Sequence, residues 1–243
     1  MSDAYIVDAV RSPIGKRNGT LASLRADELA AQVLNALVER NSLDPAEVED
    51  VQLGCVSQVG EQGWNVARMA SLVAGWPDSV PGATIDRQCG SSLQACFAAA
   101  SAVAAGHLDV VVAGGVESMS RVPMGSSGGD LSPKLLERWE IVPQGISAEL
   151  IAEEWGLSRE ELDSYAYESH RRALAAIDDG RFEREVVPVE VSTRTRASCS
   201  ASTRRRARTP HPRRWPHCSR RSSPAARSPR GTRARSATAP RRC

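Results

Sequence analysis

The chain has 243 residues, of which 41% are hydrophobic and 4% aromatic. This length and composition are typical of an α/β protein of one or two domains that buries a sizeable core. No apolar run is long enough for a transmembrane helix, and the N-terminus lacks the pattern of a secretory signal, so we expect a cytoplasmic protein.

Charge is distributed unevenly along the sequence. Sixteen of the 31 lysines and arginines, and none of the 29 acidic residues, follow Ser192. The part up to Ser192 therefore holds 15 basic and 29 acidic residues, a net charge of −14. Such an asymmetry is typical of a basic tail that binds nucleic acid or stays disordered.

The hydrophobic pattern predicts alternating strands and helices. Strands are expected at residues 4–10, 51–56, 84–86, 110–113 and 186–191. Helices are expected from Asp27, which can cap the first one, and at 65–74, 91–105, 147–155 and 159–180, with a short helix opened by Asp44-Pro45. Residues 120–146, rich in Gly, Ser and Pro, are expected to form a loop excursion. Strands that alternate with helices indicate a mainly parallel sheet covered by helices.

The segment TIDRQCGSSLQA places Cys89 on a tight turn between a strand and the start of a helix. The N–H groups and positive dipole end of that helix would stabilise a thiolate. Gly90 and the two following serines leave room for a carbonyl group beside the sulfur. A cysteine in such a place is otherwise a small core residue, and spacing alone does not decide between the two.

Four motifs, in this order, resemble the N-terminal domain of thiolases: VDAVRSPIGKRNG, LGCVSQVGEQGWNVAR, IDRQCGSSLQA and AGGVESMSRVP. The family comprises acetyl-CoA acetyltransferases and 3-ketoacyl-CoA thiolases, and the resemblance runs from Tyr5 to Val191. It implies an α/β fold of the thiolase type, with layered α-β-α architecture, of which this chain carries the N-terminal half. The complete protein would have five layers.

The resemblance also implies a domain division and a site. Residues 1–118 would form the N-terminal α/β domain, and residues 119–191 a helical loop domain on the coenzyme A side with a return strand. Cys89 matches the nucleophile that becomes an acyl thioester, and its backbone N–H would contribute to an oxyanion hole. Coenzyme A and acyl-CoA would be substrates, with no bound cofactor or metal. An intact family member is expected to be a homo-oligomer that needs neither nucleic acid nor membrane.

The remaining cysteines and histidines are interpreted as structural or solvated. The six cysteines form no CxxC pair and are expected to be free thiols. Cys55 is expected in the core and Cys96 in helix packing, whereas His107 and His170 are expected at the surface. Asp86 and Arg87 are either catalytic neighbours of Cys89 or structural salt-bridge residues, and we favour the structural interpretation.

The family reaction requires groups that this sequence lacks. They are a histidine in a GHP motif, an asparagine–glutamate motif that builds an oxyanion hole, and a second cysteine in a CxGG motif. His211-Pro212 lacks the preceding glycine, so we do not assign it the histidine role. The resemblance therefore implies an acyltransferase chain that does not complete the reaction by itself.

Residues 192–243 are expected to be a disordered basic tail, since they have no periodicity and few large apolar side chains. We interpret them as out-of-frame translation. Back-translation of residues 214–243 with G/C-ending codons, read from the third base, permits VAALLPAFIPGGTVTAGNASAIGDGAAAV. That string resembles the thiolase segment after the loop domain, which puts the frame change between residues 191 and 214.

Two other functions compete with a thiolase. A related condensing enzyme of the ketoacyl synthase kind would use an acyl carrier protein, but the VESMSRVP segment and the loop insertion favour thiolase. A nucleic-acid-binding protein would use the 16 positive charges of the tail. The tail lacks the interleaved aromatic side chains that stack on bases, so we rank this function last.

Overall fold

The computed structural model describes residues 3–193 and 196–198. All the described residues belong to a single compact unit. The predicted basic tail and its reading-frame interpretation fall almost wholly outside them. In the described part, no helix combines the length and apolarity needed to cross a membrane.

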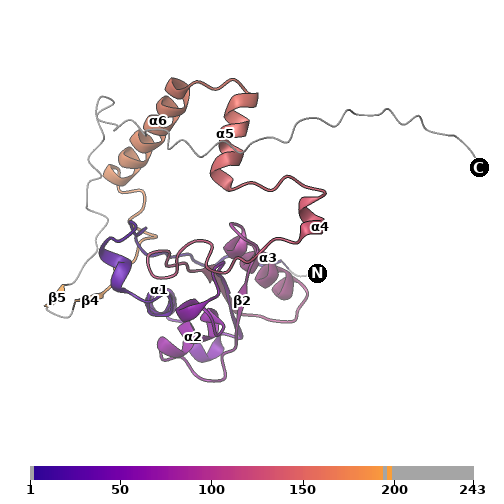
Figure 1. Cartoon of the computed structure of the whole chain (residues 1–243). Coiled ribbons are helices and arrows are strands. Elements are labelled where there is room, and N and C mark those ends of the chain that lie inside the picture. The colour runs from indigo at the N-terminus through magenta and orange to yellow at the C-terminus, as the bar shows by residue number, and fades with distance from the viewer. Residues whose placement is uncertain (1–2, 194–195, 199–243) are drawn as a thin grey trace, which may run out of the picture. The chain divides into compact units, whose positions relative to one another are not determined.

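The elements alternate between helix and strand up to residue 115 and are mainly helical afterwards (Figure 1). In chain order they are η1 (Thr20–Ser23), α1 (Ala26–Asn41), η2 (Pro45–Glu47), β1 (Asp50–Gly54), η3 (Gly60–Gln62), α2 (Val66–Val73), β2 (Gly82–Ile85), α3 (Ser91–Ala104), β3 (Val111–Gly115), α4 (Pro133–Leu136), α5 (Gln144–Glu154), α6 (Arg159–Asp178), β4 (Val191–Thr193) and β5 (Arg196–Ser198).

The main sheet is parallel, as the sequence predicts. Its order is β2-β1-β3, and both outer strands run parallel to β1. Leu53 pairs with Thr84 on one side and with Gly114 on the other, so the carboxyl ends of all three strands lie at the same edge. The central strand β1 is buried from Val51 onward, whereas β2, at the edge, is only partly buried.

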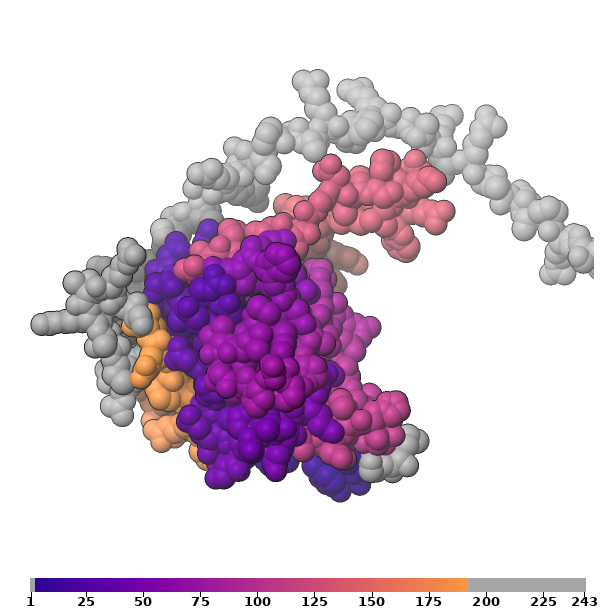
Figure 2. Space-filling view, turned by 90° about the horizontal axis from the view of Figure 1, so that it is seen from below, coloured from indigo at the N-terminus to yellow at the C-terminus, as the bar shows by residue number. Residues whose placement is uncertain are grey.

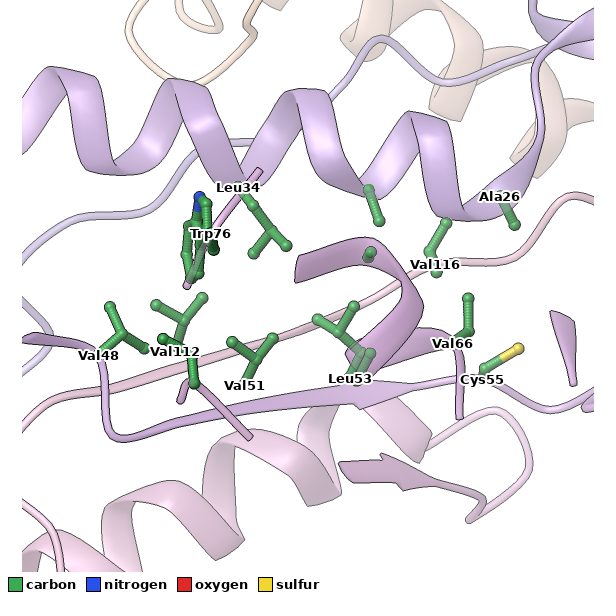
Figure 3. Packing of buried hydrophobic residues seen from close by; sticks show 14 of the residues in the cluster. Ala26, Leu34, Val48, Val51, Leu53, Cys55, Val66, Trp76, Val112 and Val116 are labelled. Carbon is green, nitrogen blue, oxygen red and sulfur yellow. The ribbon is translucent and has the colours of Figure 1, made fainter. Parts of the chain in front are cut away.

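The core lies between one face of this sheet and helices α1 and α2. Figure 3 shows Leu34 pointing from α1 toward β1, from which Val51 and Leu53 point back. Alternate residues of a strand face opposite sides, so Val51, Leu53 and Cys55 line this core together. Figure 2 shows the outer surface of this part of the chain, coloured indigo to magenta, as one continuous body. Burial of this apolar surface is the main source of stability.

Helix α3 packs on the opposite face, where small residues allow a close approach. Ala95 and Ala99 are its buried apolar side chains. A Cβ atom added to Gly54 would lie 2.3 Å from the Ser92 nitrogen, and one added to Gly115 would lie 1.9 Å from the Ser92 Oγ. The first turn of α3 therefore rests directly on the backbone of β1 and β3 at their carboxyl ends.

Two predicted strands are wrong. Residues 4–10 form no strand, and Tyr5, Ile6 and Val7 are 81%, 90% and 86% exposed. Within residues 3–193, the stretch 186–191 pairs only through an isolated bridge between Arg11 and Val186, and β4 begins at Val191. Apolar runs become strands only when a partner strand receives their hydrogen bonds. Among the described residues, 4–10 pair with no strand, and of the run 186–191 only Val191 does, with Ser198 of β5.

The N-terminal segment is nevertheless attached to residues 182–187. Arg11 donates to the Glu185 carboxylate at 2.7 Å and lies over the Phe182 ring, 5.2 Å from its centroid. The Val187 N–H donates to the Arg11 carbonyl at 2.9 Å. Val189, further along, packs with Leu21 and Leu24 in a second small cluster.

The predicted helices are present, with corrections at their starts. Arg25, rather than Asp27, is the N-cap of α1, and Asp27 lies in the first turn, where it pairs with Arg25 at 2.7 Å. Ser158 and Glu161 form the predicted capping box of α6. In the stretch predicted as a loop excursion, α4 forms and α5 begins at Gln144, earlier than predicted. Neither α5 nor α6 buries a residue among those described.

We predict that Gly54→Ala destabilises the fold by roughly 1–3 kcal/mol, because its Cβ would overlap backbone atoms of Ser91 and Ser92. The matched control is Gly114→Ala in the neighbouring strand, where a Cβ would meet only Leu53 Cδ2 at 3.6 Å. Urea unfolding should show a lower midpoint for Gly54→Ala and little change for Gly114→Ala. Equal midpoints for the two variants would contradict the close contact.

Candidate active site

Cys89 lies in the turn that joins β2 to α3, as the sequence predicts. Its side chain is exposed, and Gly90 follows it as the N-cap of α3. The preceding strand β2 is an edge strand of the three-stranded sheet and is only partly buried. The sulfur thus stands at the carboxyl edge of a parallel sheet and at the start of a 14-residue helix.

Short local hydrogen bonds define this turn. The Gln88 N–H donates to Asp86 Oδ1 at 2.8 Å, and the Gly90 N–H donates to the Arg87 carbonyl at 3.1 Å. The Ser91 Oγ accepts from the Arg87 N–H at 2.9 Å and donates to the Gln88 carbonyl at 2.5 Å. These bonds hold Gln88 in the left-handed region, with φ of 49°.

The start of α3 offers an electropositive environment beside the sulfur. Gly90 supplies no side-chain cap, and among the described residues no other side chain caps this end. Helix N-termini carry partial positive charge on N–H groups that lack intrahelical partners. Such a position favours a thiolate and stabilises an oxyanion that develops on a carbonyl attacked by it.

Glu117 ties together the chain segments that leave β1 and β3. Its carboxylate accepts from the Val56 N–H at 2.8 Å, from the Ser57 N–H at 3.3 Å and from Gln62 Nε2 at 2.7 Å. Gln62 is fully buried, and its Oε1 accepts from the Ser118 N–H at 2.7 Å. This network fixes the carboxyl ends of the two strands on which α3 rests.

A second carboxylate, Glu61, holds the next part of the same segment. It pairs with Arg121 and also with Arg25, the N-cap of α1, at 3.4 Å. The hydrogen bond from Arg121 lowers the pKa of the Glu61 carboxyl below its usual value. The VESMSRVP segment is therefore anchored to η3 and to the start of α1.

Cys55 is chemically unlike Cys89. It is fully buried, as predicted, and its thiol lies 3.8 Å from the Glu117 carboxylate. Burial, followed by the negative charge of Glu117, raises the pKa of the Cys55 thiol to about 12. Cys55 is therefore a core residue that stays protonated at neutral pH.

The other candidate residues of the sequence analysis either lie apart from Cys89 or form hydrogen bonds within the β2–α3 turn and the start of α3. Cys96 is exposed, so its predicted packing role is wrong, because the α3 face that carries it has no neighbour among the described residues. His107 and His170 are exposed, as predicted. The predicted salt bridges of Asp86 and Arg87 are wrong within the described part: Asp86 accepts from the Gln88 N–H, and Arg87 donates to Gln94.

Three features of the site were missed in the sequence. The Ser91 hydroxyl bonds to the turn before Cys89, Gly54 receives α3, and Glu117 joins the two strand ends. Gly54 could have been identified as a glycine that interrupts an apolar strand, which often marks a close backbone approach. The partners of Ser91 and Glu117 depend on tertiary geometry, which spacing does not reveal.

The comparison with known proteins gives the family. The sequence model described as "Thiolase, N-terminal domain" matches residues 4–210, most of the chain. The chain belongs to the thiolase family. The match includes all four motifs and Cys89, and it ends inside the interval in which the sequence places the frame change.

Similar thiolases extend well beyond this chain. It is 45% identical over 206 residues to the steroid 3-ketoacyl-CoA thiolase of Mycobacterium tuberculosis, covering 79% of this chain and 51% of that protein. It is 44% identical over 213 residues to the beta-ketoadipyl-CoA thiolase of Acinetobacter baylyi, covering 80% and 53%. The chain thus spans about half the length of these relatives.

A solved structure supports the fold. The Bacillus anthracis acetyl-CoA acetyltransferase matches with a TM-score of 0.72 and 38% identity, covering 82% of this chain and 54% of that one. The α/β fold of the thiolase type, in its N-terminal half, is therefore confirmed.

We predict that Glu117→Ala destabilises the fold by about 1–3 kcal/mol, because the Val56 N–H and Gln62 Nε2 lose their acceptor. Glu153→Ala, which removes an exposed carboxylate from α5, is the control and should change stability little. The two variants are compared by urea unfolding. A Glu117→Ala midpoint equal to that of the control would show that the network contributes nothing.

We predict that low iodoacetamide at neutral pH labels Cys89 before Cys96 and Cys55. Cys89 and Cys96 are both exposed, but only Cys89 stands before the start of α3, and Cys55 is buried with a pKa raised to about 12. Peptide mass spectrometry determines the order of labelling, and chymotrypsin separates Cys89 from Cys96 by cleavage after Leu93. Labelling of Cys55 first would contradict the assignment.

Proposed function

We propose that this chain is the N-terminal part of a thiolase-type acyltransferase in which Cys89 carries the acyl group. The observation that supports it most directly is an exposed cysteine at the start of α3, at the carboxyl edge of a parallel sheet, within the region that matches the thiolase family. The substrates are 3-ketoacyl-CoA and coenzyme A, as the names of the relatives indicate. No bound cofactor or metal takes part.

The chemistry follows a two-step exchange. The Cys89 thiolate attacks the 3-keto carbon, and the bond between the second and third carbons breaks. The electron pair of that bond leaves on the two-carbon fragment, which takes up a proton and departs as acetyl-CoA. The thiol of a second coenzyme A then attacks the cysteinyl thioester and releases the shortened acyl-CoA, restoring the Cys89 thiol. The reverse sequence condenses two acyl-CoA molecules.

Residues of this chain contribute the nucleophile and part of its environment. The N-terminus of α3 stabilises the thiolate, and the Cys89 backbone N–H contributes to the hole for the thioester oxyanion. The helices in residues 119–191 form the side that holds coenzyme A. Proton transfer requires the GHP histidine and the CxGG cysteine of the family, neither of which occurs in these 243 residues.

We place the intact enzyme among cytoplasmic homo-oligomers of fatty-acyl metabolism, including β-oxidation. The ketoacyl synthase alternative is disfavoured by the family match. Nucleic-acid binding rests only on the basic composition after Ser192, which we attribute to a shifted reading frame.

We predict that the 243-residue chain does not cleave acetoacetyl-CoA at an enzymatic rate, because each missing proton-transfer group typically contributes roughly 10²–10⁴-fold. Restoring the reading frame between the codons for residues 191 and 214 should restore thiolase activity. In the restored enzyme Cys89→Ser should lower kcat by at least about 10³-fold. A spectrophotometric assay of acetoacetyl-CoA cleavage measures all three proteins.

Cys96→Ser in the restored enzyme is the matched control, since it alters another exposed thiol, which lies within α3. It should keep activity within a few-fold of the unmodified enzyme. Ordinary turnover by the 243-residue chain itself, or by the restored Cys89→Ser variant, would refute the proposed function.

A further inference from the structure

We propose that Ser91 is a positioning residue that, together with Asp86, locks the turn carrying Cys89 into the shape required for attack. The inference rests on the proposed function, because it concerns how the Cys89 sulfur is presented. Ser91 does not touch the substrate in this view. It acts through the backbone of Arg87 and Gln88, immediately before the cysteine.

The hydroxyl of Ser91 contacts the turn and not its own helix. It accepts from the Arg87 N–H at 2.9 Å and donates to the Gln88 carbonyl at 2.5 Å. The same Gln88 carbonyl also accepts from the Ser91 N–H at 3.0 Å. One hydroxyl therefore bridges the two peptide groups that flank the Arg87–Gln88 peptide bond, immediately before Cys89.

Burial makes this bridge rigid. Ser91 is 4% exposed, although Cys89 and Ser92 beside it are exposed. A Cβ atom added to Gly54 would lie 2.4 Å from the Ser91 carbonyl carbon. The backbone of Ser91 is therefore held directly against the backbone of β1. The hydroxyl is thus held at a constant position relative to the sheet, and the turn is held relative to the hydroxyl.

The turn needs this support because its conformation is unfavourable by itself. Gln88 has a backbone φ of 49°, a value that residues other than glycine rarely adopt. Asp86 stabilises it from the other side, since its Oδ1 accepts from the Gln88 N–H at 2.8 Å. Strained backbone of this kind persists when surrounding contacts over-determine it, and it is concentrated at functional sites.

The consequence concerns the reactivity of Cys89. With Gln88 held, the sulfur stays beside the N–H groups at the start of α3. Without the bridge, Gln88 relaxes toward negative φ and the sulfur moves away from them. The electrostatic benefit of a helix N-terminus falls off within the first turn, so a small displacement removes it.

The experiment compares the alkylation rates of Cys55, Cys89 and Cys96 in the 243-residue chain. Cys96, exposed on the same helix, is the internal reference, and the buried Cys55 reports loss of the core. In Ser91→Ala the ratio of the Cys89 rate to the Cys96 rate should fall roughly two- to five-fold, with Cys55 still protected. Ser91→Thr keeps a hydroxyl and should keep the ratio.

The matched control is Ser101→Ala, which removes a second α3 hydroxyl that donates to a backbone carbonyl, that of Phe97 at 2.7 Å. It should leave the ratio unchanged. An unchanged ratio in Ser91→Ala, or an equal fall in Ser91→Thr, with Cys55 protected would overturn the inference. A wild-type chain in which Cys96 reacts faster than Cys89 would instead count against the proposed function.

If Cys55 becomes reactive in Ser91→Ala, that variant is unfolded. Variants at the exposed Asp86 then test whether the turn is locked. Asp86→Asn and Asp86→Ala remove the same charge, but only the asparagine keeps an oxygen that can accept from the Gln88 N–H. A lower ratio of the Cys89 to the Cys96 alkylation rate in Asp86→Ala than in Asp86→Asn supports the proposed role of these hydrogen bonds in holding the turn. Equal ratios would overturn it.

Discussion

The contact between β1 and the first turn of α3 is the constraint on which the rest of the site depends. At Gly54 the strand and the helix meet backbone to backbone, with no space for even one methyl group. That contact places the start of α3 at the carboxyl edge of the sheet, where the β2–α3 turn must then run. The exposure of Cys89 and the bridging role of Ser91 both follow from it.

The two faces of the sheet serve different purposes. On one face, α1 and α2 bury a conventional aliphatic core, which supplies stability. On the other face, α3 uses alanine, serine and glycine contacts, which bury little apolar area but define position closely. Glu117 links the ends of β1 and β3, because its carboxylate accepts from the Val56 N–H and from the buried Gln62 side chain.

The sequence was most informative where a pattern is local. The helical periodicity of α1, the capping box at Ser158 and the strand–turn–helix around Cys89 all predicted the elements that form. It failed where the outcome depends on a partner, because the apolar stretches 4–10 and 187–190 look like strands but pair with no strand in the described chain. The contacts of Ser91 and Glu117 were equally hidden, since they join residues through the tertiary fold.

The exposed N-terminal segment has a consequence for how the protein behaves in solution. Tyr5, Ile6 and Val7 are consecutive, apolar and each more than 80% exposed. An extended apolar stretch of high β-propensity can pair with the same stretch of another molecule, which lowers colloidal stability as the protein concentration rises. Handling the chain at low micromolar concentration, or with a solubilising partner fused before residue 1, would keep these segments apart.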